Sequence, residues 1–416
     1  MKNSVAMDIP AINPIDQLCR NIFMSKISKL EEGNVEIVEL FSREHQSFYF
    51  GPSVGSSESL SCKISIHHPN AYSKIVLGGS IGSGEGYMDG DWDCDQLTSL
   101  IQIMVRNRHV LEDLEGSWSR LTVPARKLIH YLKKNSIKGA KENIKAHYDL
   151  GNDFFGLFLG STWMYSSGYF PKIDSTLEEA QFEKNDRICR KLNLKADDHL
   201  LEIGTGWGSF AIHAAKNYGC KVTTTTISKK QYELAASRIL AEGLNDQITL
   251  LEKDYRLLTG KYDYLVSIEM IEAVGLNFID DYFEKCSSLL KPDGQMVLQG
   301  ITIRDHFFEN AKKNVDFIQK YIFPGTAIPS VSYLSQAIAS KSDLQLSHLE
   351  DFGNHYARTL HIWSERLKLQ KHEVFKQGYS ERHYRMWQYY FSYCEGGFLE
   401  TSIGVMQMHL KKPRAL

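Results

Sequence analysis

The chain has 416 residues, of which 43% are hydrophobic and 24% charged, and this ordinary globular composition allows two or three domains with sizeable cores. A formal net charge of -2 gives no general attraction to nucleic acid, so we expect no nucleic-acid partner. The seven cysteines are widely spaced without a Cys-x-x-Cys pair, and we expect no bound metal. No run approaches the roughly 20 apolar residues of a membrane-spanning helix. These features predict a cytoplasmic protein.

Residues 1–125 predict a small α+β domain that associates with lipid or substrate. Short strand-like stretches separated by glycine and serine turns are typical of such a domain. They read VEIVELF, SFYFG, SCKISIHH and KIVLGG, and GEGYMDGDWDCDQLTSLIQIMVRN then continues into a helix.

Residues 126–160 predict a basic connector and lid. Between Arg126 and Lys145 there are seven basic residues and one acid, with apolar residues interleaved. Such a segment is either a solvated linker helix or a patch that binds an anionic membrane surface, where each basic side chain contributes about 1 kcal/mol. The carboxyl-terminal KKPR offers a smaller second patch.

Residues 161–416 predict a doubly wound α/β domain, because strand-like and helical runs alternate. The strand-like runs are HLLEIG, KVTTTTI, ITLLEKD, YDYLVSI and GQMVLQGIT. Two further runs, LQLSHLEDF and GVMQMHLKK, predict two more strands after the fifth, and this ending resembles the reversed strand pair of class I methyltransferases.

A glycine loop, LEIGTGWGS, follows the first of these strands, where a ligand is expected at the carboxyl edge of the sheet. The dinucleotide fingerprint requires Gly-x-Gly-x-x-Gly and an acid about 20 residues later. Here the third glycine, Gly208, comes one position early, and the second strand ends in threonines. This spacing favours the S-adenosylmethionine loop of class I methyltransferases over a nucleotide loop or a structural turn. This resemblance implies that Glu202 orients the groups holding the methionine end of the cofactor and that Asp254 is placed to take the adenine amino group.

Several stretches in order resemble the cyclopropane-fatty-acid synthase family of fatty-acid and phospholipid methyltransferases. They are HYDLGNDFF (147–155), MYSSGYF (164–170), LEIGTGWGSFAIHAA (201–215), TTISKKQ (225–231), SIEMIEAVG (267–275), DFIQKYIFPG (316–325), HYARTLHIW (355–363) and YCEGGF (393–398). GEGYMDGDWDCD (84–95) also resembles the amino-terminal domain of the phospholipid-acting members.

The resemblance implies methyl transfer from S-adenosylmethionine to a cis double bond of an unsaturated phospholipid acyl chain. The resulting cation loses a proton to close a cyclopropane ring. Peripheral binding to the inner face of the membrane and a homodimer are also implied. The positions matching cofactor-binding residues are Tyr165, Ser166, Glu202, Gly204, Thr205, Gly206, Trp207, Gly208, Thr226, Gln231 and Tyr255.

In the phospholipid-acting members a bound bicarbonate is thought to take the proton. The resemblance places Glu272, Ile301 and Tyr356 at three of its contacts, whereas Ser167 and Gln299 replace the family's cysteine and histidine. Serine and glutamine still hydrogen-bond an anion, so a bicarbonate site is chemically feasible. The replacements also open a second outcome, a methyl- or methylene-branched chain. Cys394, considered catalytic in the family, is expected to pack only, because a sulfonium donor needs no covalent enzyme intermediate.

Aromatic side chains are expected to wall off the cation, because their ring faces stabilise positive charge. They are Tyr148, Tyr165, Tyr169, Tyr321, Tyr356 and Trp363. Two other classes of function share parts of this pattern. A small-molecule or nucleic-acid methyltransferase shares the glycine loop, and a non-enzymatic lipid-binding protein shares the amino-terminal domain and connector.

Overall fold

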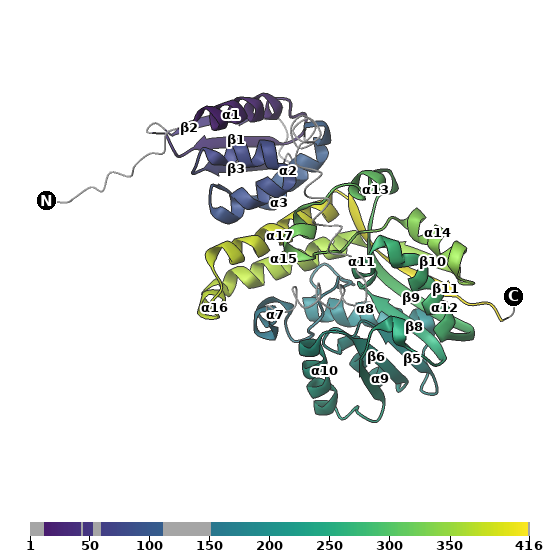
Figure 1. The fold of residues 1–416 in the computed structure, drawn as a ribbon. Coiled ribbons are helices and arrows are strands. Elements are labelled where there is room, and N and C mark those ends of the chain that lie inside the picture. The colour runs from purple at the N-terminus through teal and green to yellow at the C-terminus, as the bar shows by residue number, and fades with distance from the viewer. Residues whose placement is uncertain (1–11, 43–44, 53–59, 111–150, 415–416) are drawn as a thin grey trace. The chain divides into compact units, whose positions relative to one another are not determined.

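The computed structural model describes residues 12–42, 45–52, 60–110 and 151–414, which form two compact units (Figure 1). The first unit combines the amino-terminal part, up to residue 128, with two later segments, 316–321 and 374–400. The second unit takes 129–315, 322–373 and the carboxyl-terminal residues from 401. The connector between Arg126 and Lys145 lies outside the described residues, so the domain boundaries drawn from the sequence stay predictions.

The first unit is α+β, as expected, and its four-stranded sheet has the order β2-β1-β3-β4. Strand β1 pairs antiparallel with β2 and parallel with β3, and β4 pairs antiparallel with β3. The elements of this unit are α1 (Pro14–Ile27), β1 (Asn34–Glu39), β2 (Gln46–Phe50), β3 (Ser61–Ile66), α2 (Asn70–Asp89), β4 (Trp92–Cys94), α3 (Leu97–Arg106) and α17 (Glu381–Leu399). Helix α1 starts where the Asn13 side chain accepts from the backbone N–H groups of Ile15 and Asp16.

The stretch KIVLGG, expected to be a strand, lies instead inside helix α2. A short apolar run does not by itself distinguish a strand from a buried helix. Val76 is buried with Ala71 and Tyr72, which precede the run, whereas Leu77 is exposed, and Gly79, the last residue of the run, has φ of 57° and ψ of -142° and kinks the helix. The strand prediction was wrong because the run is too short to show the helical spacing of buried residues, which becomes visible only with Ala71 and Tyr72.

The second unit has the α/β fold of the methyltransferases, as predicted, with a seven-stranded sheet of order β10-β11-β9-β8-β5-β6-β7. The five strands β9, β8, β5, β6 and β7 are parallel to one another. Strand β11 is antiparallel to both of its neighbours, β9 and β10. The strands are β5 (His199–Ile203), β6 (Lys221–Thr226), β7 (Ile248–Glu252), β8 (Tyr262–Ile268), β9 (Leu290–Ile303), β10 (Gln345–Asp351) and β11 (Ile403–Lys411).

The longer helices flank this sheet in the α/β manner (Figure 1). They are α7 (Asn152–Leu159), α8 (Leu177–Leu192), α9 (Ser209–Tyr218), α10 (Lys229–Ala241), α12 (Ile279–Leu289), α14 (Val331–Lys341) and α15 (Gly353–Leu369). The described part of the chain after β7 also contains shorter helices: η2 (Tyr255–Leu257), α11 (Ile271–Val274), η3 (Leu276–Phe278), α13 (Asp305–Ala311), η4 (Ile318–Ile322) and α16 (Lys371–Lys376). Within the described part of the chain, no helix combines the length and apolar character needed to cross a membrane.

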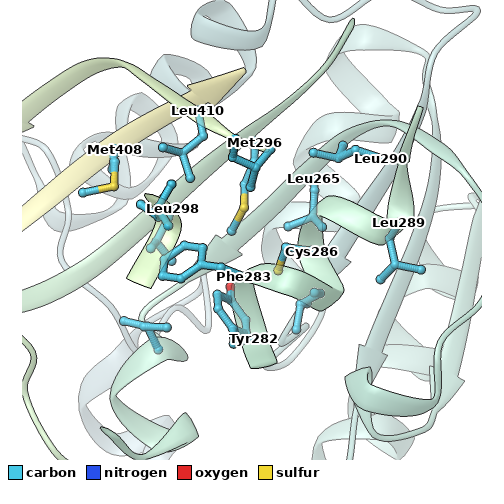
Figure 2. Close-up of a cluster of buried hydrophobic side chains, with 14 of the residues drawn as sticks. Leu265, Tyr282, Phe283, Cys286, Leu289, Leu290, Met296, Leu298, Met408 and Leu410 are labelled. Carbon is cyan, nitrogen blue, oxygen red and sulfur yellow. The ribbon is translucent and has the colours of Figure 1, made fainter. Parts of the chain in front are cut away.

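One face of the sheet is held by a hydrophobic core under α12 (Figure 2). Tyr282, Phe283 and Cys286 of α12 pack with Met296 and Leu298 of β9, and all five are buried. Burying one such side chain stabilises the fold by about 1.5–3 kcal/mol. The close packing therefore fixes the carboxyl ends of β5, β8 and β9, where the predicted site residues lie.

Candidate active site

The loop after β5 has the backbone of a ligand cradle. Gly204, Gly206 and Gly208 have φ values of 96°, 53° and 86°, which side-chain-bearing residues rarely adopt. A Cβ added at Gly206 would meet no heavy atom within 4 Å, whereas one at Gly208 would lie 3.3 Å from Ala235 Cβ. Gly208 thus permits close packing against α10, and Gly206 borders open space.

Glu202 is the penultimate residue of β5, one residue before this loop, and is buried. The Thr224 hydroxyl donates to its Oε2 at 2.6 Å. Burial raises the pKa of Glu202 to about 7, while the bond from Thr224 and the charge of Lys184 oppose the rise. A carboxyl group so placed accepts from a cofactor amino group at little cost in reorganisation.

Aromatic rings line the neighbouring part of the site. The ring of Phe155 lies 5.3 Å from that of Trp207 and 5.4 Å from that of Tyr165. Tyr165 also lies 5.4 Å from Trp363, whose ring is 6.2 Å from Tyr356. Three of the rings expected around the cation, those of Tyr165, Tyr356 and Trp363, therefore form one cluster with the cofactor-loop tryptophan.

The residues predicted for the adenosine side follow β6 and β7. Thr226 Oγ1 donates to Gln231 Oε1 at 2.9 Å, which links the end of β6 to α10. The Asp254 carboxylate, directly before Tyr255, accepts from the guanidinium of Arg256 at 2.9 and 2.6 Å. An adenine amino group would share this carboxylate with Arg256, since each carboxylate oxygen accepts more than one bond.

A carboxylate that the sequence analysis did not assign, Glu269, occupies the centre of the predicted anion site. Its Oε1 accepts from the backbone N–H of Ser167 at 2.9 Å and from Gln299 Nε2 at 2.8 Å. Its Oε2 accepts from the Tyr356 hydroxyl at 2.7 Å. Three residues predicted to hold bicarbonate thus direct their donors at a carboxylate of the protein itself.

The backbone at Glu269 is unusual. It follows β8 directly and has φ of 48°, a left-handed conformation that costs a side-chain-bearing residue on the order of 1–3 kcal/mol. Its backbone N–H donates to the Gln299 carbonyl at 2.8 Å, which anchors this conformation to β9. Burial raises the pKa of the side chain, and its three hydrogen bonds and Lys184 oppose that rise. Strain of this kind concentrates at functional sites.

Gln299 is oriented by a second contact, because its Oε1 accepts from Gln407 Nε2 at 2.9 Å. That contact leaves the amide nitrogen to donate to Glu269. The Ser167 hydroxyl, by contrast, donates to the Gly168 carbonyl at 2.9 Å, so Ser167 serves the site through its backbone N–H.

Glu272 lies three residues after Glu269, in the short helix α11, and is also buried. The backbone N–H of Ile301 donates to its Oε1. Burial, and then repulsion by Glu269, raise the pKa of Glu272 to about 8, so it carries a proton at neutral pH. In this arrangement Glu272 is a neutral neighbour of the hydrogen-bonded Glu269 side chain.

The comparisons with known proteins agree with this geometry. The model of the mycolic acid cyclopropane synthetase family matches residues 135–408. The chain belongs to this family.

Two curated family members match most of the chain. The tuberculostearic acid methyltransferase UfaA1 of Mycobacterium tuberculosis is 33% identical over 368 residues, 86% of each protein. The cyclopropane-fatty-acyl-phospholipid synthase of Escherichia coli is 36% identical over 353 residues, 83% of this chain and 86% of that enzyme. A solved structure of mycolic acid cyclopropane synthase CmaA1 complexed with SAH is 31% identical, has a TM-score of 0.61, and covers 65% of this chain and 98% of its own.

As a member of the cyclopropane synthetase family, this chain is an S-adenosylmethionine-dependent fatty-acid methyltransferase. The dinucleotide and non-enzymatic alternatives are thereby set aside. The family comparison leaves two products open, because one of the two curated relatives is named for a cyclopropane and the other for tuberculostearic acid.

Some residues predicted for the catalytic site are not among those that the structure brings together around Glu269. Cys394 is on α17 and Tyr321 is in η4, both within the first unit. Desolvation and nearby Asp316 raise the pKa of the Cys394 thiol, which makes it a poor nucleophile at neutral pH. Tyr169 stacks on His355 at 4.3 Å and faces the Arg187 guanidinium at 3.9 Å, so both faces of its ring are in use. Tyr148 lies outside the described residues.

Sequence reasoning missed two buried charged residues, Glu269 and Lys184. Glu269 had a readable signal, since an acid directly after a parallel strand lies at the ligand-binding edge of the sheet. The signal for Lys184 was its helical spacing, which places it on the same buried face as Leu177, Ala180 and Ile188.

Proposed function

We propose that this enzyme transfers a methyl group from S-adenosylmethionine to a double-bond carbon of an unsaturated phospholipid acyl chain, with Glu269 as the proton acceptor and a methyl- or methylene-branched chain as the product. The observation that carries the proposal is the position of the Glu269 carboxylate. It receives the three hydrogen bonds from Ser167, Gln299 and Tyr356 that the family resemblance assigns to bicarbonate.

The cofactor supplies an activated methyl group on a sulfonium. The alkene π electrons form the new carbon–carbon bond to the methyl group as its bond to sulfur breaks. Both electrons of that bond go to sulfur, S-adenosylhomocysteine leaves, and positive charge remains on the neighbouring carbon. A C–H bond beside that carbon then breaks, its electrons form a double bond, and the proton passes to a Glu269 oxygen, which gives the methyl-branched chain. A 1,2-hydride shift before proton loss moves the charge to the methyl-bearing carbon, and loss of a methyl proton then gives the methylene branch. Atoms and charge balance without an oxidant, and a separate reductase would saturate the product.

The electrostatics of the site support an internal base. A free bicarbonate beside the buried Glu269 would meet like charge, which is costly in a medium of low polarity. Glu272 is protonated at neutral pH and cannot accept a second proton. The aromatic cluster of Tyr165, Tyr356 and Trp363 limits access of water that would trap the cation.

The branched product is supported by the likeness to UfaA1, whose name is that of a tuberculostearic acid methyltransferase. Cyclopropane formation is the second candidate. It is supported by the 36% identity to the Escherichia coli synthase and by the presence of Glu272, Ile301 and Tyr356 at matching positions. The two reactions share the cation and differ in which C–H bond is broken.

The substrate proposal, an acyl chain of a phospholipid, rests on the name of the Escherichia coli relative. Access at the inner membrane surface through the connector, and a homodimer, are further parts of this proposal that come from the sequence.

The test combines lipid mass spectrometry with variants of Glu269. Fragmentation of lipids from a host expressing the chain distinguishes a branch from a ring. Purified native enzyme should keep its activity when bicarbonate is removed. Glu269→Gln should lower turnover by about 10²-fold or more, the usual scale for an acid–base group, with S-adenosylmethionine affinity near native.

Glu269→Gly is the sharper variant, because glycine accepts the φ of 48° without strain and leaves the three donors free for an external anion. Its activity should be low and should rise when bicarbonate is added. Full turnover by Glu269→Gln, or native activity that requires bicarbonate, would reject Glu269 as the base. A cyclopropane in the lipids would reject the branched product alone.

A further inference from the structure

Three buried polar residues on α8 hold the segment that contains Ser166 and Ser167. Gln181 Nε2 donates to the Ser166 carbonyl at 2.7 Å, and Lys184 Nζ donates to the Ser166 hydroxyl at 3.1 Å. Asn185 Nδ2 and Lys184 Nζ both lie near the Met164 sulfur, at 3.2 and 3.3 Å. These three buried polar residues of α8 therefore fix the loop segment whose Ser167 donates to Glu269.

Lys184 is exceptional among the three, because its side chain is 0% exposed and carries a potential charge. A hydroxyl and a thioether do not neutralise an ammonium, and an unpaired buried charge is costly. Two carboxylates provide the opposite charge. Burial lowers the pKa of Lys184 to about 7, and the charges of Glu269 and Glu202 oppose that shift.

We propose that Lys184 is the shared counter-ion of Glu202, on the cofactor side, and Glu269, on the proton-accepting side, and that it couples the charge of the bound cofactor to the basicity of Glu269. Lys184 is a positioning residue in this scheme and contacts neither substrate nor cofactor. The part concerning Glu269 rests on the proposed function.

The strand order brings Glu202 and Glu269 close enough for Lys184 to interact with both. Glu202 is the penultimate residue of β5 and Glu269 follows β8, and these two strands are hydrogen-bonded neighbours with Glu202 opposite Val266. Lys184 Nζ donates to the Ser166 hydroxyl, and the next residue, Ser167, donates its backbone N–H to Glu269, so the ammonium lies at the carboxyl edge of this strand pair. Replacing it by a neutral group would leave two buried carboxylates without their common positive charge, so at least one would take up a proton.

The other groups near this trio do not supply that positive charge. His213 of α9 interacts with Lys184, but burial lowers its pKa to about 4 and it is neutral at pH 7. Glu269 further faces Tyr356 and Glu272, which are both protonated at neutral pH. Lys184 is therefore the cation on which the ionisation of both carboxylates depends, among the groups that the structure describes around them.

The cofactor and its demethylated product provide a direct test, because they differ by the methyl group and the positive charge of the sulfonium. A positive charge beside Glu202 should favour loss of a proton from Lys184. We expect calorimetric titration of the native enzyme near pH 7, in buffers of different ionisation enthalpy, to show more proton release with S-adenosylmethionine than with S-adenosylhomocysteine. The expected difference is about 0.3 proton or more per site, by linkage. Equal release for the two ligands would overturn the coupling.

Lys184→Met and Gln181→Leu separate charge from positioning. Both remove a hydrogen bond to Ser166, and only Lys184→Met removes a charge. Lys184→Met should alter the difference in proton release, because the sulfonium then acts on the protonated carboxylates alone, and should move the acid limb of the kcat–pH profile upward by about one unit, since Glu269 becomes harder to ionise. Gln181→Leu should lower kcat with the acid limb unmoved.

Identical pH profiles for the two variants would mean that Lys184 acts only as a structural contact. The calorimetric comparison uses the native enzyme and binding alone, so it does not depend on the variants folding or on Glu269 being the base. Failure of Glu269 as the base would appear in Glu269→Gln and would leave the proton-release result intact.

Discussion

Replacing Glu272 with glutamine should stabilise the protein, and the gain should grow with pH. The Glu272 carboxyl is buried, and within the part of the chain that the structure describes its Oε2 has no hydrogen-bond partner. Burial, followed by the charge of Glu269, raises its pKa from 4.5 to about 8 in the folded protein. Glutamine keeps the shape and does not titrate.

The stability difference grows with pH because the folded and unfolded chains bind different numbers of protons. Between pH 4.5 and about 8 the folded protein holds the Glu272 proton, whereas the unfolded chain has released it. The native free energy of unfolding therefore falls with rising pH in this window by about 1.4 kcal/mol per pH unit, relative to a chain without the group. Between pH 5.5 and 7.5 the Glu272→Gln variant should gain about 2.7 kcal/mol over the native protein.

The assay is urea unfolding of both proteins at several pH values in this range, followed by tryptophan fluorescence. The difference between the two unfolding free energies cancels the titration of the groups that do not interact with Glu272. Glu284→Gln, at an exposed position of α12, is the matched control for the same change of chemistry. A difference that stays constant from pH 5.5 to 7.5 would refute the burial argument for Glu272.

Three further predictions concern other parts of the chain. Gly206→Val should lower S-adenosylmethionine affinity by about 100-fold or more with the fold retained, because its side chain would enter the open space of the loop; native affinity in calorimetry would show that the loop is misassigned. Cys394→Ser should keep turnover within about twofold, since a protonated thiol is a poor nucleophile, and a loss above tenfold with intact cofactor binding would contradict this. Reversal of Lys133, Lys134 and Lys138 to Glu should weaken binding to anionic vesicles and flatten its salt dependence, whereas unchanged vesicle binding would indicate a plain linker.

The sequence alone determined the class of fold and the cofactor. Alternation of strands and helices, the early third glycine at Gly208 and the two closing strands are local patterns, and local patterns depend on nearest neighbours in the chain. The same reasoning placed Glu202, Thr226 and Asp254 at the ends of successive strands. It failed for KIVLGG, because a run of three large apolar residues is compatible with both kinds of element.

Only the tertiary structure decided what fills the predicted anion site. Ser167, Glu269, Gln299 and Tyr356 come from separate strands, helices and loops, and their convergence depends on strand order and on the left-handed backbone of Glu269. The protonation states of Glu272 and Lys184 likewise follow from burial, which depends on how the whole unit packs. A sequence lists which residues can titrate, whereas the surrounding medium, created only by folding, sets the pH at which they do so.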